Sequence, residues 1–446
     1  MAQENKMGVM PTGPLLWSMS IPVMLSMLVS ALYNIIDSMF IARISDDALT
    51  AVSLCFPVQL LMIALATGIG VGLNVLLSQA LGAGDRTSAD RIAGNGIFLS
   101  LVCWGLFAVI GWFGSTPFLA LFTKKAAILS MGTDYLRVCT LFSCEVFLLF
   151  TAERLMQATG KTVYHMIIQC IGAVINVVLD PILIFGLLGA PALGVKGAAI
   201  ATVIGQCTAM AIGFLLNYKL NHDIHFSVAA LRPDKTIVRR MCRIGLPAAA
   251  VQALSTAMTA GMNAILMPLS SSAVGFFGVY YKLQNFLYMP LYGLTNTMVP
   301  IIGYNLGAKK YDRIRGVTRN AVLFALGIMW VGSLLFLLFP HALLSLFGEE
   351  GLRFTGGVLA IRIIALSFLP SAITLTLCGV LQGLGRSGTA LLAAALRQLV
   401  LLLPAAWLLG LVGFPVLWFA FPLAEIVTLP IAWLLSRRVF REIPGL

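Results

Sequence analysis

Twelve runs of apolar residues, each long enough to cross a membrane as a helix, follow one another along this chain. A spanning helix needs about 20 apolar residues, and glycines, prolines and charge clusters cut the sequence into pieces of that length. Only 10% of the residues are charged, whereas a soluble domain averages roughly 25%, so buried core helices of a large soluble protein are disfavoured. The predicted fold class is all-α and integral to the membrane, with spans near 15–42, 51–78, 92–114, 133–156, 163–188, 194–217, 243–268, 275–304, 318–340, 357–380, 388–410 and 413–436.

The second half of the chain repeats the first at an offset of 225 residues. Matched pairs include Ile21-Pro22 with Leu246-Pro247, Gly68 with Gly293, Leu81-Gly82-Ala83 with Leu306-Gly307-Ala308, and Gln157 with Gln382. Both halves enter the membrane with the same orientation because six is even, so we expect two pseudo-symmetric six-helix bundles, parallel repeats related by an axis along the membrane normal. The predicted boundaries are an N-terminal lobe at 1–220, a cytoplasmic linker at 221–242 and a C-terminal lobe at 243–446.

The basic net charge of +12 follows the topology of the chain. If both termini are cytoplasmic, 20 of the 29 Lys and Arg residues fall on the inner side, five on the outer side and four within spans. This asymmetry matches the positive-inside rule. We therefore expect a multi-pass protein of the cell membrane with both termini in the cytoplasm, whose basic loops face anionic lipid headgroups and bind no nucleic acid.

Two carboxylates with carboxamide neighbours lie deep within the predicted spans of the first half. Asn34 and Asp37 are three residues apart in the first span, and Asn176 and Asp180 are four apart in the fifth, so each pair shares a helix face. An ionisable group in the bilayer needs an explanation, and burial disfavours the charged form of a carboxylate. The four residues therefore predict a proton or small-cation site; the alternative is a polar clamp between helices.

Other polar residues of the first half complete this hypothesis. Pro181 follows Asp180 and predicts a helix kink, and a kink frees carbonyl groups that must line a cavity or meet protein. Thr202 and Gln206 lie one turn apart in the small-residue sixth span, where packing between helices explains them equally well. Tyr33 and Glu145 are further candidates for a substrate cavity.

The second half has a different set of charges inside its spans. Lys282, Arg397 and Glu425 are each in an apolar run and are expected to pair inside this half, although the sequence does not say which residues are partners.

Several catalytic and cofactor signatures fail in this sequence. It has no H-E-x-x-H zinc motif, and Gly160-Lys161-Thr162 lacks the earlier glycine of a phosphate-binding loop, where Leu155 stands instead. His222 and His225 are better explained as linker residues than as metal ligands. We expect no enzyme activity, no cofactor and no bound metal, apart from a coupling ion.

Several local patterns, in this order and spacing, resemble the multidrug and toxic compound extrusion (MATE) family over essentially the whole chain. They are Ile21-Pro22 followed by Asn34 and Asp37, Leu81-Gly82-Ala83, Asn176-x-x-x-Asp180-Pro181, Gly197-Ala198-Ala199 to Thr202, and Tyr304-Asn305-x-Gly307-Ala308.

The resemblance implies secondary antiport, in which inward protons or sodium drive the export of organic, often cationic, drug-like compounds by a monomeric transporter. In the DinF-like branch of the family the coupling site lies in the first half, which by motif corresponds to Asp37, Asn176, Asp180 and Thr202. In the NorM-like branch second-half acids also matter, and this chain has Ser255 and Ser371 at those positions. That departure favours the DinF-like branch and coupling to protons, with sodium at the same residues as the competitor.

Two other functions compete with the antiporter. A lipid-linked oligosaccharide or glycolipid flippase of the related superfamily would need a cationic cavity for a pyrophosphate. The first two spans contain no deep Arg or Lys and contain Asp37 instead, which favours the antiporter. A membrane-embedded enzyme is the third possibility, disfavoured by the missing catalytic residues.

Overall fold

The computed structural model describes residues 5–225, 228–348 and 354–445, and this part of the chain consists of helices and their connections. The chain forms two compact units. We call Leu25–Leu246 the N unit, and Met1–Met24 together with Pro247–Leu446 the C unit. The predicted lobes at 1–220 and 243–446 and the predicted linker at 221–242 remain predictions.

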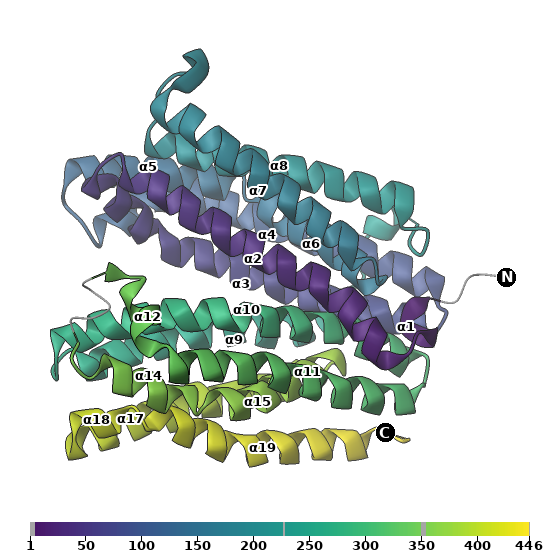
Figure 1. Cartoon of the computed structure of the whole chain (residues 1–446). Coiled ribbons are helices and arrows are strands. Elements are labelled where there is room, and N and C mark those ends of the chain that lie inside the picture. Colours follow the sequence, from purple (N-terminus) through teal and green to yellow (C-terminus); the bar gives the residue numbers. More distant parts are fainter. Residues whose placement is uncertain (1–4, 226–227, 349–353, 446) are drawn as a thin grey trace. The chain divides into compact units, whose positions relative to one another are not determined.

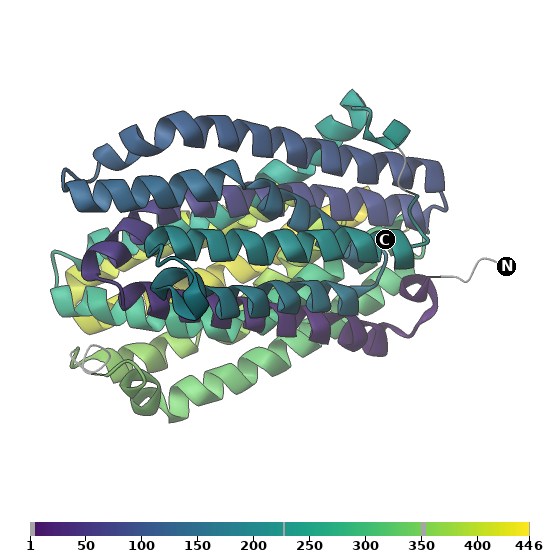
Figure 2. The same cartoon turned by 90° about the horizontal axis from the view of Figure 1, so that it is seen from above.

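The N unit contains most of the helices of the first repeat. In Figure 1 they run from the purple α2 to the teal α8, and in Figure 2 the blue helices α4 and α5 lie side by side. The elements are the end of α2 (Thr12–Ala42), α3 (Asp46–Gly82), α4 (Arg86–Ala120), α5 (Ala126–Leu141), α6 (Cys144–Ala158), α7 (Thr162–Phe185), η1 (Leu187–Gly189), α8 (Val195–Leu220), η2 (Val228–Leu231) and the start of α9 (Lys235–Leu266).

The C unit holds the second repeat and the first residues of the chain. Its elements are α1 (Lys6–Val9), the start of α2, most of α9, α10 (Ser271–Gly307), α11 (Tyr311–Leu338), α12 (Pro340–Ser345), α14 (Gly357–Ala365), α15 (Phe368–Gly383), α16 (Ser387–Ala395), the π-helical η3 (Leu396–Leu401), α17 (Leu402–Val412), α18 (Phe414–Leu417) and α19 (Ala420–Glu442).

The predicted fold class is confirmed. Among the described residues, eight helical segments are long and apolar enough to cross a membrane, and two further spans are bent helix pairs. The helices α9 and α10 complete the twelve: they are 32 and 37 residues long, and only their composition keeps them outside the ten most apolar spans. The protein is an all-α integral membrane protein with two sets of six spans.

The fourth span of each half is bent. The helices α5 and α6 meet at 42°, and α14 and α15 meet at 48°. A serine stands at each break: the hydroxyl of Ser143 donates to the carbonyl of Thr140 at 2.8 Å, and that of Ser367 to the carbonyl of Ile364 at 2.6 Å. Serine side chains that bond back to the preceding turn often accompany a bend, and the same arrangement stands at the break in the fourth span of both repeats.

The division between the units falls beside two prolines that the repeat matches, Pro22 and Pro247. The start of α2 therefore packs in the C unit, where Met24 lies against Gly293. In the same way the start of α9 packs in the N unit, where Gly245 lies against Gly68. Each unit thus contains the beginning of the other repeat's first long helix.

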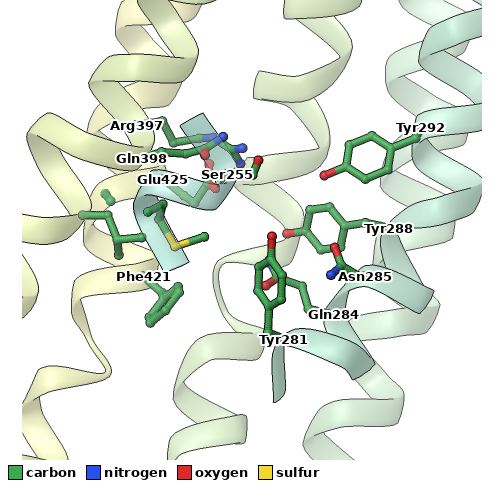
Figure 3. Close-up of a pocket in the computed structure, with 13 residues that line it drawn as sticks. Ser255, Tyr281, Gln284, Asn285, Tyr288, Tyr292, Arg397, Gln398, Phe421 and Glu425 are labelled. Atoms are coloured by element: carbon green, nitrogen blue, oxygen red, sulfur yellow. Dashed lines mark hydrogen bonds and ion pairs between the residues drawn. The ribbon is translucent and has the colours of Figure 1, made fainter. Parts of the chain in front are cut away.

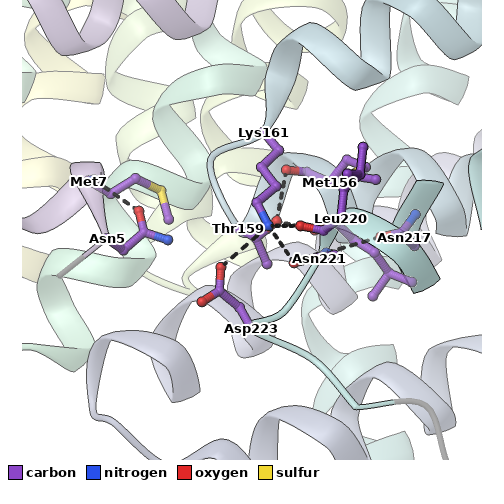
Figure 4. Close-up of polar contacts among 10 residues, drawn as sticks. Asn5, Met7, Met156, Thr159, Lys161, Asn217, Leu220, Asn221 and Asp223 are labelled. Atoms are coloured by element: carbon purple, nitrogen blue, oxygen red, sulfur yellow. Dashed lines mark hydrogen bonds and ion pairs between the residues drawn. The ribbon is translucent and has the colours of Figure 1, made fainter. Parts of the chain in front are cut away.

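Lys161 connects two helices at one end of the N unit. Its ammonium donates to the carbonyl of Leu220, the last residue of α8, and reaches Asn221 Oδ1 at 3.5 Å and Asp223 Oδ2 at 4.0 Å (Figure 4). A cation is favourable at a helix C-terminus, where carbonyl groups lack partners. Burial lowers the pKa of the Lys161 ammonium, and the Asp223 carboxylate opposes that change.

Candidate functional site

The close packing of α7 and α8 brings the predicted coupling residues together. A side chain at Gly205 of α8 would place its Cβ 2.8 Å from the carbonyl oxygen of Gly172 and 3.3 Å from the Cβ of Asn176, both on α7. Such a contact is too close for any residue larger than glycine, so Gly205 permits the approach. As a consequence, Thr202 on α8 reaches Asn176 on α7.

Asn176, Asp180 and Thr202 form a hydrogen-bonded group inside the N unit. The Asn176 Nδ2 group donates to Thr202 Oγ1 at 3.1 Å and to Asp180 Oδ1 at 3.4 Å. Asn176 is 2% exposed and Asp180 is fully buried. Asp180 Oδ2 and Asn176 Oδ1 have no hydrogen-bond partner among the described residues, so the group retains acceptor oxygens for a proton or a small cation.

We group Asp37 on α2 with these residues as the acid cluster, which consists of Asp37, Asn176, Asp180 and Thr202; its link to the other three is electrostatic and not a hydrogen bond. Its carboxyl group is within electrostatic reach of Asp180. Asp37 Oδ1 is buried and receives no hydrogen bond from the part of the chain that the structure describes. Two carboxylates with unpaired oxygens repel one another when both are charged, so a bound proton or cation would relieve the repulsion.

The two α2 neighbours of Asp37 behave differently from each other. Asn34 is exposed, and its Nδ2 donates to the carbonyl of Ser30 at 2.7 Å, one turn back on the same helix. Tyr33 is partly buried and lies within electrostatic reach of both Asp37 and Glu145. The structure therefore brings Tyr33 toward the acidic side chains, whereas Asn34 bonds to its own helix.

Glu145 lies in the first turn of α6, directly after the bend. Its side chain is 3% exposed, and Oε2 is without a partner in the described chain. A helix N-terminus has free N–H groups and favours negative charge. The repeat mate is Pro370, in the first turn of α15, where a proline is tolerated because that N–H would be free anyway. The two unlike residues therefore suit the same local position.

The remaining predicted residues have less defined contacts. Pro181 lies inside α7, four residues before the helix ends at Phe185, and the predicted kink remains a prediction. Gln206 is partly buried, one turn after Thr202 on α8, and has no hydrogen bond to the acid cluster in the described structure.

Sequence reasoning missed two polar residues beside the acid cluster. Gln59 Nε2 on α3 donates to the hydroxyl of Tyr135 on α5 at 3.2 Å, and the buried Tyr135 is within electrostatic reach of Asp37. A glutamine in an otherwise apolar run was the available signal for Gln59. Nothing in the local sequence marks Tyr135, because tyrosine is also common at the ends of membrane spans.

A second network connects three helices of the N unit. His165 Nε2 lies 3.1 Å from Ser26 Oγ, and His165 Nδ1 lies 3.5 Å from Glu153 Oε2. Arg154 is next to Glu153 in the chain, but its guanidinium donates to Gln157 Oε1 at 2.7 Å. All of these side chains are buried, and neither Ser26 nor His165 was identified from the sequence.

The structure of the C unit shows the partners of the second-half charges Lys282, Arg397 and Glu425. Arg397 Nη1 on η3 donates to Glu425 Oε1 on α19 at 2.7 Å. Lys282 lies over the ring of Phe347, with 5.9 Å from its Nζ to the ring centroid. Ser371 shares a hydrogen bond of 2.7 Å with the hydroxyl of Tyr288. Within the described residues, no group of three or more His, Cys, Asp or Glu side chains is arranged to hold a metal ion.

Ionisable and amide side chains buried between the spans of a repeated membrane protein are typical of membrane transporters. The comparison with known families agrees. The MatE family model matches residues 22–182 and again 247–408, and the two matches begin 225 residues apart, which is the offset of the internal repeat. The chain belongs to the MATE family. It is therefore a transporter and not an enzyme, as predicted, whereas the DinF-like branch remains a prediction.

Curated relatives and solved structures extend the likeness over nearly the whole chain. The multidrug export protein MepA of Staphylococcus haemolyticus is 28% identical over 90% of this chain and 88% of its own length. A protein named FAD transporter, from Shewanella oneidensis, is 25% identical over 96% of this chain and 95% of its own. The Vibrio cholerae MATE transporter VcmN has a TM-score of 0.90 at 24% identity, with 97% of each chain covered, and so shares the fold.

Proposed function

We propose that this protein is a secondary antiporter that exports organic, often cationic, compounds in exchange for inward protons by alternating access. Sodium at the same residues is the competing coupling ion. The observation that supports this proposal is the acid cluster: two carboxylates within electrostatic reach of each other, with oxygens that no described residue satisfies. Buried carboxylates that lack partners are typical of ion-coupling sites in membrane proteins.

The mechanism is competition between the proton and the cargo. When Asp37 and Asp180 are charged, the acid cluster attracts a cationic compound from the cytoplasmic side. A proton that enters from outside removes one negative charge and relieves the repulsion between the carboxylates. The attraction for the cation falls, and the compound leaves on the outer side. Asn176 keeps Asp180 and Thr202 connected through its Nδ2 group, so protonation at Asp180 acts on both α7 and α8.

The driving force is sufficient for efflux. One charge that crosses 100 mV supplies about 2.3 kcal/mol, and a tenfold proton gradient adds about 1.4 kcal/mol. One proton per transported molecule therefore sustains a gradient of roughly a few hundredfold for a neutral cargo. Exchange of one proton for a singly charged cation moves no net charge, so the potential cancels and the proton gradient alone sustains about a tenfold concentration gradient of that cargo.

The names of the relatives indicate different cargo, and the charge of the acid cluster favours one kind over the other. MepA is named for multidrug export and the Shewanella relative for FAD, which is an anion. The acid cluster, with Glu145 nearby, contains acids and no base, so it favours cations over anions. We propose that the protein lies in the cell membrane with both termini in the cytoplasm, which the distribution of Lys and Arg supports. The monomeric state is a proposal that follows from the family resemblance.

The test is efflux of ethidium from vesicles that contain the purified protein, with the proton and sodium gradients imposed separately. Wild type is expected to export ethidium under an inward proton gradient, and Asp37→Asn and Asp180→Asn are expected to reduce export to background. Asp312→Asn is the matched control, because the Asp312 side chain is 98% exposed. Efflux that persists in both site variants rejects the acid cluster, and Glu145 becomes the next residue to replace. If wild type moves no cation under either gradient, the flippase alternative is favoured.

A further inference from the structure

The C unit contains a pocket with a different chemical character from the acid cluster. Figure 3 shows it between α10, whose Tyr281, Tyr288 and Tyr292 form one wall, and the side chains of Arg397, Gln398 and Glu425 on the other. The free space is about 50 Å³, which is room for the charged end of a ligand rather than for a whole drug-sized molecule. We call this the ion-pair pocket; it is lined by Ser255, Met258, Tyr281, Gln284, Asn285, Tyr288, Tyr292, Arg397, Gln398, Leu402, Phe421, Ala424 and Glu425.

Three acceptor oxygens of the ion-pair pocket have no donor in the described structure: Gln284 Oε1, Gln398 Oε1 and Glu425 Oε2. Gln398 is 6% exposed and Glu425 is 8% exposed, so neither is a surface group satisfied by bulk solvent. An unpaired buried acceptor costs about 1–3 kcal/mol. A ligand that supplies N–H donors would recover that cost.

The backbone at this point is also unusual. Arg397 and Gln398 lie in η3, a π-helical segment between α16 and α17. Single π-helical turns inside α-helices are rare and occur frequently at functional sites. The extra residue in the turn changes the direction in which side chains leave the helix, and both polar side chains of η3 line the ion-pair pocket.

The charges of the ion-pair pocket cancel. Arg397 and Glu425 form a buried pair at 2.7 Å, and the other lining residues are neutral. A purely cationic ligand would lie beside the guanidinium of Arg397, and a purely anionic ligand would lie beside the carboxylate of Glu425. Each would therefore leave one charge of the pocket without a partner, which costs binding free energy. A ligand with both charges pairs with both groups. The tyrosine rings beside them suit an aromatic body.

We propose that the ion-pair pocket is a second ligand site, specific for aromatic compounds that carry an ammonium and a carboxylate side by side. The carboxylate binds Arg397, the ammonium donates to Glu425 Oε2 and the two glutamine oxygens, and the ring packs against the tyrosines. In transport, which rests on the proposed function, this site gives the protein zwitterionic cargo in addition to the cations that the acid cluster attracts.

The test measures binding to the purified full-length protein with three matched probes. Tryptophan is the zwitterion, its methyl ester is the cation, and N-acetyltryptophan is the anion. Wild type is expected to bind tryptophan about tenfold or more tightly than either derivative. Arg397→Gln removes the positive charge that binds a carboxylate and should reverse the preference toward the ester, whereas Glu425→Gln removes the negative charge and should shift it toward the anion. Equal binding of the three probes by wild type, or no change of preference in the variants, overturns the proposal.

Because removal of one charge can unfold the protein, the second pair of variants leaves the ion pair intact. Gln398→Met and Gln284→Met remove oxygens that no described residue satisfies, so the unfolding temperature should stay equal or rise while tryptophan binding falls about fivefold. Gln252→Met, at an exposed position of α9 outside the pocket, is the matched control. Unchanged tryptophan binding in both pocket variants overturns the proposal. Ethidium efflux by a wild type that binds no tryptophan would reject this site alone and leave the proposed antiport standing.

Discussion

The two repeats place polar side chains in comparable spans but with different chemistry. In the N unit, the acid cluster uses the first, fifth and sixth spans and contains two carboxylates without a base. In the C unit, the ion-pair pocket uses the first, second, fifth and sixth spans, and its one carboxylate is held by an arginine. The comparison teaches that duplication preserved where polar groups can be buried, while substitution changed what they can bind.

The difference follows from the cost of burying charge. A carboxylate without a basic partner is stable in a buried site only when it takes up a proton or a cation, so it responds to ion gradients. A carboxylate paired with arginine stays charged and responds much less. Only the first arrangement is suited to coupling, and the second is suited to recognition.

The largest expected effect is on proton release, which should distinguish the acid cluster from the ion-pair pocket. Addition of ethidium to purified wild type in weak buffer should release protons, measured with a pH-sensitive dye, because the cation displaces protons from the acid cluster. Asp180→Asn should reduce the release at least about tenfold, since the amide binds no proton in this range. Asp312→Asn should match wild type. Loss of release in Glu425→Gln as well would break the comparison.

The next effect is on stability and concerns the ion-pair pocket. Arg397→Gln should lower the free energy of unfolding by about 3–5 kcal/mol, because the buried Glu425 carboxyl loses its partner and must either stay charged at a cost or take up a proton. The double variant Arg397→Gln/Glu425→Gln should recover most of this loss. Thermal unfolding in detergent gives both values. If the single and double variants unfold alike, the two side chains are not energetically coupled.

A smaller effect tests the helix contact beneath the acid cluster. Gly205→Ala should destabilise the N unit by about 1–3 kcal/mol, since the new Cβ would stand 2.8 Å from the carbonyl oxygen of Gly172. It should also weaken ethidium-driven proton release, because the new methyl group would push α8 away from α7 and so separate Thr202 from Asn176. Gly105→Ala on α4 is the matched control: nothing lies within 4 Å of its Cβ, so the higher helix propensity of alanine should leave stability equal or raise it. An equal response of both variants would contradict the close contact.

The smallest effect is expected from the hydroxyl of Thr202. Thr202→Val keeps the shape of the side chain and removes the acceptor of the 3.1 Å bond from Asn176. The loss of one hydrogen bond, about 1 kcal/mol, should weaken ethidium binding about fivefold. Measured binding that does not change would assign Thr202 to helix packing, the alternative that its small-residue sequence allows.

Much of the architecture was predictable because its causes are local or periodic. Apolar runs of spanning length define the helices, and the offset of 225 residues predicted the two halves that the family model later matched at 22–182 and 247–408. Asn176 and Asp180 lie on one helix, so their spacing alone placed them on one face. The bends at Ser143 and Ser367 were not predicted, because a serine whose hydroxyl bonds back to the preceding turn also occurs inside continuous helices, such as Ser78 in α3.

The sequence by itself determined that the chain crosses a membrane about twelve times, that it is duplicated, and that its buried acids are concentrated in the first half. Only the tertiary structure decided which helices approach closely enough for side chains to meet. Thr202 meets Asn176 because Gly205 permits contact there, Asn34 turns back to its own helix, and Glu425 is neutralised by Arg397. Hydrophobicity acts on each segment separately, whereas the pairing of buried polar groups depends on distances between residues far apart in the chain.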